Sequence, residues 1–432
     1  ATVLAHGVAP SSARSLAHFH SPTLISAAAT ELAIGATNQS LDSYDQAPAA
    51  TLVEDHLVRW LATRIGLSPG ATGVLTAGGT ASNLLGLLLA REHAAARTAT
   101  THATGTGMRA VVITSEAAHF SVAQACLVLG LGRSAAVTVA VDDHGRMGVG
   151  ALSDALTRAG DDGDRVVAVV ATVGTTDLGA VDAIDEIAAL TRAHDTWLHV
   201  DAALGSAFAL SDRLRHHLDG IEHADSVTAD LHKLWWQPIS ASALLVRDPN
   251  AFAVIADHHD YLNRADDEER GVLNLVGRSL DTSRRFDALK AVVSLRATGR
   301  REMAAMLEHV VDEAHAAAAT ISAHQRLELL APPSTVTVVF RWVGDGAHTE
   351  AELDAVNCAI QQQVFEQGRA VIGRTRWRGR VALKLSIVNP LVDASDVGAV
   401  LDEILAVGEA VATTLGATTP GATATVAGPA RG

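Results

Sequence analysis

Short apolar runs alternate with amphipathic helical segments between about residues 70 and 250 of this 432-residue chain. The run at residues 166–172 is continuously apolar, which is typical of a strand covered on both faces. Such alternation predicts a layered α/β domain with a mostly parallel central sheet. The predicted strands are residues 73–75, 110–114, 135–141, 166–172, 196–201, 226–229 and 242–247, and the predicted helices between them are residues 81–97, 121–129, 151–159 and 181–194.

The chain is long for a single core, so a large domain and a smaller one are expected. We expect an N-terminal segment at residues 1–69, a large domain at 70–295, a small α+β domain at 296–410 and a disordered tail at 411–432. Outside the large domain, the predicted helices are residues 51–65, 285–296, 302–323, 352–367 and 395–408, and the predicted strands are residues 335–343 and 381–388.

Composition excludes several classes of protein. The formal net charge of -15 argues against nucleic acid as a partner, because phosphate binding needs clustered Lys and Arg. No run is long enough to span a membrane and no export signal is expected, so a cytoplasmic protein is predicted. Two cysteines give no disulfide framework. No metal site is expected, since adjacent residues in the cluster at 257–260 point to different faces and the acidic run at 266–269 suits a solvated loop.

A carboxylate and an amine follow two neighbouring predicted strands. Asp201 ends one apolar strand, and Lys233 comes 32 positions later (233 minus 201), just after the strand at residues 226–229. A buried carboxylate needs a cationic or donor partner, and an amine followed by Leu234 and two tryptophans is partly desolvated. Either residue alone could form a structural salt bridge. Together they suit a pyridoxal phosphate (PLP) enzyme, in which the amine binds the cofactor aldehyde and the carboxylate keeps the pyridine nitrogen protonated.

The segment Gly78-Gly79-Thr80 joins a predicted strand to a predicted helix. Glycines let a backbone approach a phosphate, and the helix N-terminus with a capping hydroxyl attracts the anion. Alone, such a segment is more often a tight turn with a capped helix. Its position upstream of Asp201 and Lys233 predicts a phosphate cradle, because ionisable groups that converge in a cleft indicate function.

Two further polar residues follow predicted strands. His119 comes shortly after residues 110–114, where a flat imidazole could stack on the cofactor ring, and Thr176 follows residues 166–172, where its hydroxyl could meet the ring or the phosphate. Each has an ordinary reading as well, because histidines near strand ends and threonines in turns are common for structural reasons.

In their order along the chain and in their residues, these motifs resemble those of the group II PLP-dependent decarboxylases, the family of the aromatic amino acid, glutamate, histidine and diaminobutyrate decarboxylases. The likeness runs from about residue 18 to residue 408. It rests on residues 38–40, 47–51, 78–80, 119, 174–176, 199–203, 232–233, 283–290 and 383–384. The stretches at 236–240 and 260–263 look most like the bacterial diaminobutyrate branch.

The resemblance implies an α/β fold of the aspartate aminotransferase type (fold type I) and a homodimer with sites at the subunit interface. Lys233 would be the Schiff-base lysine and Asp201 the partner of the pyridine nitrogen, with His119 stacked on one face of the ring. The residues that hold the cofactor would be Gly79, Thr80, His119, Thr176, Asp201, Ala203, Asp230, His232 and Lys233. The catalytic residues would be Lys233, His119 and His232, and Ser21 and Tyr44 would lie near the substrate entrance.

Two positions depart from the family pattern. Leu275 stands where the aromatic branch has a loop tyrosine that returns the proton after carbon dioxide leaves, so His232 or a water is the expected donor. Leu204 stands where many relatives have an aromatic residue, which would reshape the pocket.

The predicted reaction is PLP-dependent decarboxylation of an L-amino acid to its amine, catalysed by a carboxy-lyase. Oxidative deamination coupled to decarboxylation, aldol-type cleavage and transamination stay open as alternatives, because the ring stabilises several carbanions. A non-catalytic binding protein with this fold is the other alternative, and the presence of Lys233 and Asp201 argues against it. With 3% aromatic residues a large aromatic cage is not expected. Lys384 could meet a substrate carboxylate or a structural one.

Overall fold

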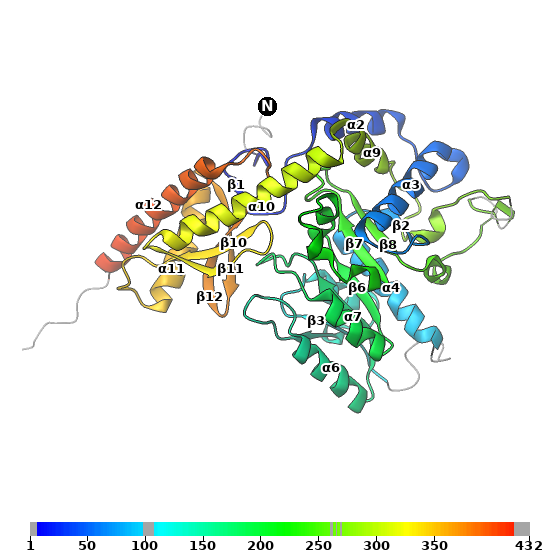
Figure 1. Ribbon diagram of the computed structural model, residues 1–432, viewed down its shortest axis with the longest axis horizontal. Helices are drawn as coiled ribbons and strands as arrows, with labels where there is room; N and C mark the ends of the chain where they lie inside the picture. Colours follow the sequence, from blue (N-terminus) through cyan, green and yellow to red (C-terminus); the bar gives the residue numbers. More distant parts are fainter. Residues whose placement is uncertain (1–6, 98–107, 260–261, 265, 268–269, 419–432) are drawn as a thin grey trace, which may run out of the picture.

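The computed structural model describes residues 7–97, 108–259, 262–264, 266–267 and 270–418. They form a larger and a smaller lobe, each built around one β-sheet (Figure 1). Helix α10 (Arg300–Ala323) extends from the larger lobe along the smaller one. The boundary that we propose between the two domains, near residue 296, lies within helix α9 (Ala288–Thr298), directly before α10.

The larger lobe contains a seven-stranded sheet with the order β2-β8-β7-β6-β5-β3-β4. Its strands are β2 (Thr72–Thr76), β3 (Ala110–Ser115), β4 (Ala136–Val139), β5 (Arg165–Thr172), β6 (Trp197–Asp201), β7 (Ser226–Asp230) and β8 (Ser242–Val246). The pairs from β7 to β4 are parallel, and β8 is antiparallel to both of its neighbours. The predicted, mostly parallel sheet is therefore confirmed.

Helices cover both faces of this sheet, as the continuously apolar run in β5 predicted. Ala168 and Val170 pack in one buried cluster with α4 (Gly79–Arg97) and α5 (Ser121–Val128). Val169 and Ala171 point the other way, into the cluster that includes α6 (Val149–Asp161) and α7 (Ile184–Ala193). Successive side chains of a strand point to opposite faces, so a strand with helices on both sides must be apolar throughout.

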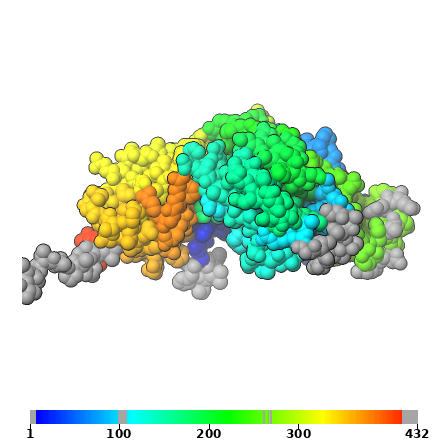
Figure 2. Space-filling view, turned by 90° about the horizontal axis from the view of Figure 1, so that it is seen from below, coloured from blue at the N-terminus to red at the C-terminus, as the bar shows by residue number. Residues whose placement is uncertain are grey.

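The smaller lobe contains a five-stranded sheet with the order β1-β11-β12-β10-β9. Its strands are β1 (Ser15–Leu16), β9 (Leu327–Ala331), β10 (Thr337–Trp342), β11 (Val371–Trp377) and β12 (Arg380–Ser386), and its helices besides α10 are α11 (Glu350–Glu366) and α12 (Ala394–Thr418). The short strand β1 pairs in parallel with β11, so the N-terminal segment joins the C-terminal sheet. Figure 2 shows this blue segment between the two lobes.

The remaining N-terminal helices pack on the larger lobe. Helix α2 (Ile25–Thr37) lies against α9, and α3 (Pro48–Ile65) packs beside β2. Short 3-10 helices are η1 (Tyr44–Gln46), η2 (Arg133–Ala135), η3 (Gly205–Leu210), η4 (Arg215–Leu218), η5 (Ile221–His223), η6 (Pro249–Val254) and η7 (Val276–Arg278). Among the described residues, no helix is both long and apolar enough to cross a bilayer.

Several elements differ from the sequence-based prediction. β1, α2, β9 and β11 were not predicted, because β1 has only two residues and β11 carries exposed polar side chains. Helix α12 continues through Thr418, so a tail that begins at residue 411 is wrong for residues 411–418. Residues 419–432 lie outside the described part of the chain.

Candidate active site

A cavity of about 540 Å³ lies at the carboxyl ends of β5, β6 and β7, next to the N-terminus of α4. The carboxyl ends of parallel strands meet at one edge of a sheet, where α/β proteins bind ligands. Its lining includes every residue predicted to hold the cofactor: Gly79, Thr80, His119, Thr176, Asp201, Ala203, Asp230, His232 and Lys233. The amine and the carboxylate that the prediction paired thus face one cavity.

Asp201 ends β6, which lies between β5 and β7, and its side chain is buried. The backbone N–H of Ala203 donates to Asp201 Oδ1 at 3.1 Å, and Asn83 Nδ2 donates to Oδ2 at 2.8 Å. Hydrogen bonds to an ionised carboxylate are strong and directional. The two donors therefore set the orientation of the carboxylate at the cavity wall.

Lys233 lies in the turn that follows β7. Its Nζ is 3.1 Å from Asp230 Oδ2, and the centroid of the Phe19 ring is 5.8 Å from Nζ. Asp230 is almost completely buried, and its Oδ1 has no hydrogen-bond partner. Ser21 Oγ donates to the carbonyl oxygen of Lys233 at 2.7 Å, so this serine supports the lysine turn.

The glycine segment before α4 has the geometry of a cradle. Gly78 has a φ of 144°, which side chains other than glycine rarely adopt. A Cβ on Gly79 would lie 3.0 Å from Asp230 Oδ1 and 3.1 Å from Oδ2, so any larger residue would press on this buried carboxylate. A helix N-terminus without side chains in front of it is suited to a phosphate group. The residues present therefore fit PLP.

His119 lines the same cavity from the loop between β3 and α5. Burial lowers the pKa of this imidazole, Asp201 opposes the shift and Lys233 adds to it. His119 Nδ1 is 2.8 Å from Ser121 Oγ, and its ring centroid is 4.3 Å from that of Phe120. A neutral, flat ring at this wall is compatible with stacking on a cofactor.

His232 precedes the lysine and faces Asp230. Its Nδ1 lies 2.7 Å from the carbonyl oxygen and 3.2 Å from the backbone nitrogen of Ala241, and its Nε2 is 3.6 Å from Asp230 Oδ2. The Nδ1 bond leaves Nε2 as the nitrogen available to the cavity.

Lys384 of β12, in the smaller lobe, is not among the residues that line the cavity, but it contacts two of them, Thr176 and Phe19. Its Nζ donates to the carbonyl oxygen of Thr176 at 2.9 Å and lies 3.6 Å from Asp177 Oδ1. Burial lowers the pKa of this amine, and Asp177 opposes the shift. The Phe19 ring centroid is 5.9 Å from Lys384 Nζ, so the ring contacts both Lys384 and Lys233.

Other predicted positions lie elsewhere. Ser21 is buried against the lysine turn and is not part of the cavity wall. Tyr44 lines a separate cavity of about 330 Å³ within the chain. Leu275, at the position of the loop tyrosine in the aromatic branch, is buried, and its apolar side chain cannot donate a proton. Asp260 and Tyr261 lie outside the described residues.

Phe19 and Asn83 are among the cavity residues that sequence reasoning did not assign to the site. The signal for Asn83 was a polar residue on the buried face of an otherwise apolar helix, because such a group needs hydrogen-bond partners. Phe19 had no comparable signal, since only the tertiary fold brings it to Lys233.

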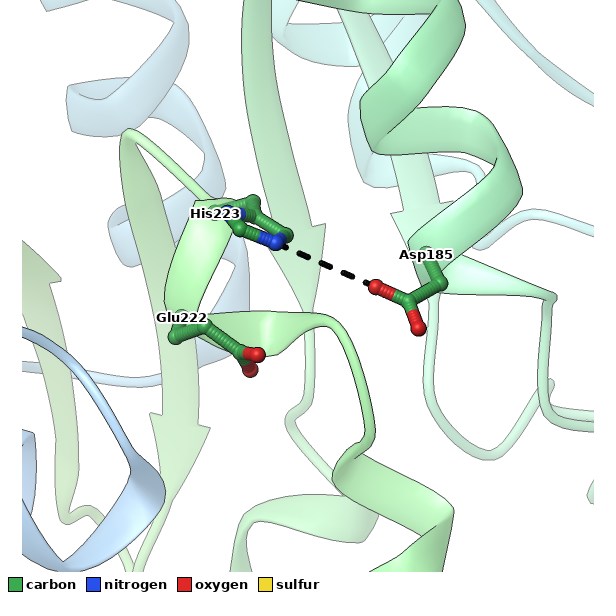
Figure 3. A group of neighbouring side chains, drawn as sticks. All are labelled: Asp185, Glu222 and His223. Atoms are coloured by element: carbon green, nitrogen blue, oxygen red, sulfur yellow. Dashed lines mark ion pairs between the residues drawn. The ribbon is translucent and has the colours of Figure 1, made fainter.

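One group of metal-ligand type exists among the described residues, away from this cavity. Asp185, Glu222 and His223 bring one ligand atom each to within 4.8 Å of one another at the start of α7 and in η5 (Figure 3). His223 Nε2 is 3.9 Å from Asp185 Oδ1. Both carboxylates are exposed to solvent, so the group is a surface ion pair between His223 and Asp185 with the Glu222 carboxylate beside it.

Comparison with known proteins identifies the family. Residues 1–343 match the model of the pyridoxal-dependent decarboxylase conserved domain. An L-2,4-diaminobutyrate decarboxylase of Acinetobacter baumannii is 40% identical over 91% of this chain and 80% of its own length. One from Rhizobium meliloti (strain 1021) is 42% identical over 93% of this chain and 79% of its own.

A solved structure agrees with these relatives. The glutamate decarboxylase domain of diaminobutyrate-pyruvate transaminase and L-2,4-diaminobutyrate decarboxylase from Vibrio parahaemolyticus superposes with a TM-score of 0.82 at 35% identity, over 92% of this chain and 81% of that one. The predicted fold type is confirmed, and so is the predicted cofactor, PLP. The chain belongs to the family of pyridoxal-dependent decarboxylases.

Proposed function

We propose that this enzyme decarboxylates L-2,4-diaminobutyrate to propane-1,3-diamine. The bond between Cα and the carboxylate breaks, carbon dioxide leaves, and Cα takes up one proton. One observation carries the proposal: Lys233, Asp201 and the glycine cradle line a single cavity in a chain that is 40% and 42% identical to two L-2,4-diaminobutyrate decarboxylases.

Different residues of the protein would hold and orient different parts of the cofactor. Bound PLP supplies the electron sink for the breaking bond. Lys233 would hold the cofactor covalently, Asp201 would keep a proton on its ring nitrogen, and Gly79 and Thr80 would hold its phosphate. Asp230 Oδ2, at 3.1 Å, is placed to take a proton from Lys233 Nζ. Such groups stabilise charge most when water is excluded.

Lys384 is the proposed partner of the substrate carboxylate. It is 7% exposed, and its Nζ faces the same Phe19 ring as Lys233 Nζ. A cation in this place would orient the substrate carboxylate while it keeps its ion pair with Asp177.

His232 is the proposed proton donor to Cα, since a leucine replaces the loop tyrosine. Its Nδ1 bonds to the backbone of Ala241, which leaves Nε2 on the side of the Asp230 carboxylate, 3.6 Å from Oδ2. His232→Gln is expected to retain PLP while proton return slows, which solvent-deuterium incorporation at Cα would report.

The test is product analysis with purified, PLP-loaded protein. Incubation with L-2,4-diaminobutyrate, L-ornithine, L-glutamate and L-tryptophan is followed by trapping carbon dioxide and by mass spectrometry of the product. Equimolar carbon dioxide and propane-1,3-diamine are expected, and Lys233→Ala is expected to lose both turnover and the visible band of lysine-bound PLP. Formation of an aldehyde or a keto acid as the main product would favour the deamination or transamination alternatives.

We also propose that the chain acts as a homodimer, as the resemblance implied. Large apolar side chains are exposed beside the cavity: Ile239, on its wall, is 59% exposed and Phe120, next to His119, is 68% exposed. Helix α2 leaves Ile25 and Leu32 exposed. Exposed apolar patches mark interaction surfaces. Sedimentation of the holoenzyme as a monomer at micromolar concentration would contradict a dimer. A cytoplasmic location stays a prediction.

A further inference from the structure

A buried hydrogen-bond network connects Trp197 to Asp201 behind the cavity wall. Trp197 Nε1 donates to Ser226 Oγ at 2.9 Å. An indole N–H can only donate, so Ser226 Oγ accepts it, and His199 Nδ1 lies 2.7 Å from the same oxygen. The direction of the remaining bonds is set at the other end, where the Asp201 carboxylate accepts from Asn83 Nδ2 and so turns Asn83 Oδ1 toward His199.

Asn83 thereby fixes the tautomer of His199. Because Asn83 Oδ1 can only accept, the neutral ring carries its hydrogen on Nε2, which donates to this oxygen at 3.0 Å, and its Nδ1 accepts from the Ser226 hydroxyl. Burial lowers the pKa of His199 to about 4, so the ring is neutral at physiological pH. Thr228 Oγ1 also donates to Asn83 Oδ1, at 2.7 Å. Two donors at this oxygen fix the amide orientation.

The other end of Asn83 meets the two groups that line the cavity. Its Nδ2 donates to Asp201 Oδ2 at 2.8 Å and to Ser121 Oγ at 2.9 Å. Ser121 Oγ therefore accepts from Asn83. His119 Nδ1 accepts the backbone N–H of Ser121 at 3.3 Å, so it carries no hydrogen, and the Ser121 hydroxyl 2.8 Å away donates to it as well. Asn83 is 1% exposed and uses all four of its hydrogen-bonding positions.

We propose that Asn83 is a positioning residue of this enzyme: it orients the Asp201 carboxylate and, by occupying an acceptor position of Ser121 Oγ, directs the Ser121 hydroxyl hydrogen to Nδ1 of His119. His119 then accepts at Nδ1 and carries its proton on Nε2. The same side chain thereby holds the acceptor for the ring nitrogen and the flat ring of the cavity wall in one arrangement. This role concerns the cofactor alone and does not depend on which amino acid is the substrate.

Asn83→Asp tests the role, because it keeps the shape and replaces the donor facing Asp201 by an acceptor. PLP affinity of the apoprotein is measured by fluorescence titration, and the His119 tautomer by ¹⁵N NMR of the imidazole. We expect the PLP dissociation constant to rise roughly 10- to 100-fold, the range for losing a hydrogen bond to a charged group. The ¹⁵N shift of His119 Nδ1 is expected to change, because an aspartate at position 83 competes with this nitrogen for the Ser121 hydroxyl hydrogen.

Asn357→Asp is the matched control. Asn357 is fully buried in the smaller lobe, where its Nδ2 and Oδ1 bond to the backbone of Trp342 at 2.9 Å. It is expected to lower thermal stability while PLP affinity stays within twofold of the wild type. An equal loss of PLP affinity in both variants would show a general effect of folding and would overturn the proposal.

Ser121→Ala serves as the second variant, in case Asn83→Asp does not fold. It removes the link to His119 and leaves the bond between Asn83 and Asp201 intact. The backbone N–H of residue 121 still donates to His119 Nδ1 in this variant, so the tautomer should be kept. We expect the ¹⁵N shift of Nδ1 to change, because this nitrogen loses its 2.8 Å hydroxyl donor, and PLP affinity to stay within about threefold, below the loss of a charged hydrogen bond. An unchanged Nδ1 shift would refute the link from Asn83 through Ser121 to His119.

Discussion

Arg284 and Glu54 form a buried ion pair that anchors the strand before the glycine cradle. Arg284 Nη1 donates to Glu54 Oε1 at 2.6 Å and to the carbonyl oxygen of Leu75 at 3.3 Å, and Leu75 N–H donates to Glu54 Oε1 at 3.1 Å. The side chains of the pair are 7% and 0% exposed. The N–H and the carbonyl oxygen of Leu75 are thus both hydrogen-bonded to the ion pair, near the end of β2.

Arg284→Met is expected to destabilise the protein by about 3–5 kcal/mol, because it leaves a buried carboxylate without its cation. That is a large fraction of the roughly 5–15 kcal/mol that holds a typical domain folded. At about 2 °C per kcal/mol, near the lower end for long chains, the melting temperature should fall by about 6–10 °C. PLP affinity should fall as well, since the cradle follows Leu75 directly.

The pH dependence has a definite sign. Burial raises the pKa of Glu54 above its usual value, and Arg284 opposes this shift. Without Arg284 the pKa rises further, so the folded state binds the proton more tightly than the unfolded state. Stability of the variant is then highest below the unfolded pKa of about 4.5 and is lost as pH rises through the folded value.

Thermal unfolding at pH 5 and pH 8, at fixed protein concentration, measures both effects. Arg285→Met is the matched control: this neighbouring side chain is 52% exposed and pairs with Glu31, which Lys290 also contacts at 2.6 Å. An exposed pair contributes about 0–1 kcal/mol. Equal melting temperatures for the two variants, or a larger loss for Arg284→Met at pH 5 than at pH 8, would refute the reasoning.

Three further outcomes are expected. Gly79→Ala should weaken PLP binding at least tenfold, because the added methyl lies 3.0 Å from the buried carboxylate of Asp230. Gly70→Ala is the control, since nothing lies within 4 Å of its methyl, and fluorescence titration with PLP compares the two variants. Burial raises the pKa of Cys126 to about 11, so a disulfide reagent at pH 8 should modify the half-buried Cys358 first, as peptide mass mapping would show. Burial lowers the pKa of His217 to about 4, so stability should fall as pH drops from about 6.5 toward 4, and His217→Gln should flatten that slope in urea unfolding.

The sequence was sufficient for the elements with strong local patterns. The strand at 165–172 was predicted within one residue at its start, because its apolar run meets helices on both faces. β1 and α2 could not be predicted in this way. Ser15 pairs with Val371, so the strand exists only through a partner at the far end of the chain.

The same distinction applies to the candidate site: some of its residues were recognised from local sequence, and others reach the cavity only through the fold. Asp201 and Lys233 were recognised because both follow strands that meet at one sheet edge, and the structure places both on one cavity. Phe19 was missed, and Ser21 was expected near the substrate although its hydroxyl bonds to the Lys233 carbonyl. The segment that carries both residues reaches the cavity only because β1 joins the smaller lobe.

The amino-acid sequence by itself determined which chemical groups this enzyme has and which strands and helices carry them, since periodicity and residue type are local properties. Only the tertiary structure decided how these groups are oriented. The direction of the bonds from Trp197 to Asp201 depends on contacts among α4, β6 and β7. Hydrogen-bond direction is a property of atoms in space, and residues far apart in the chain meet only after the sheet has formed.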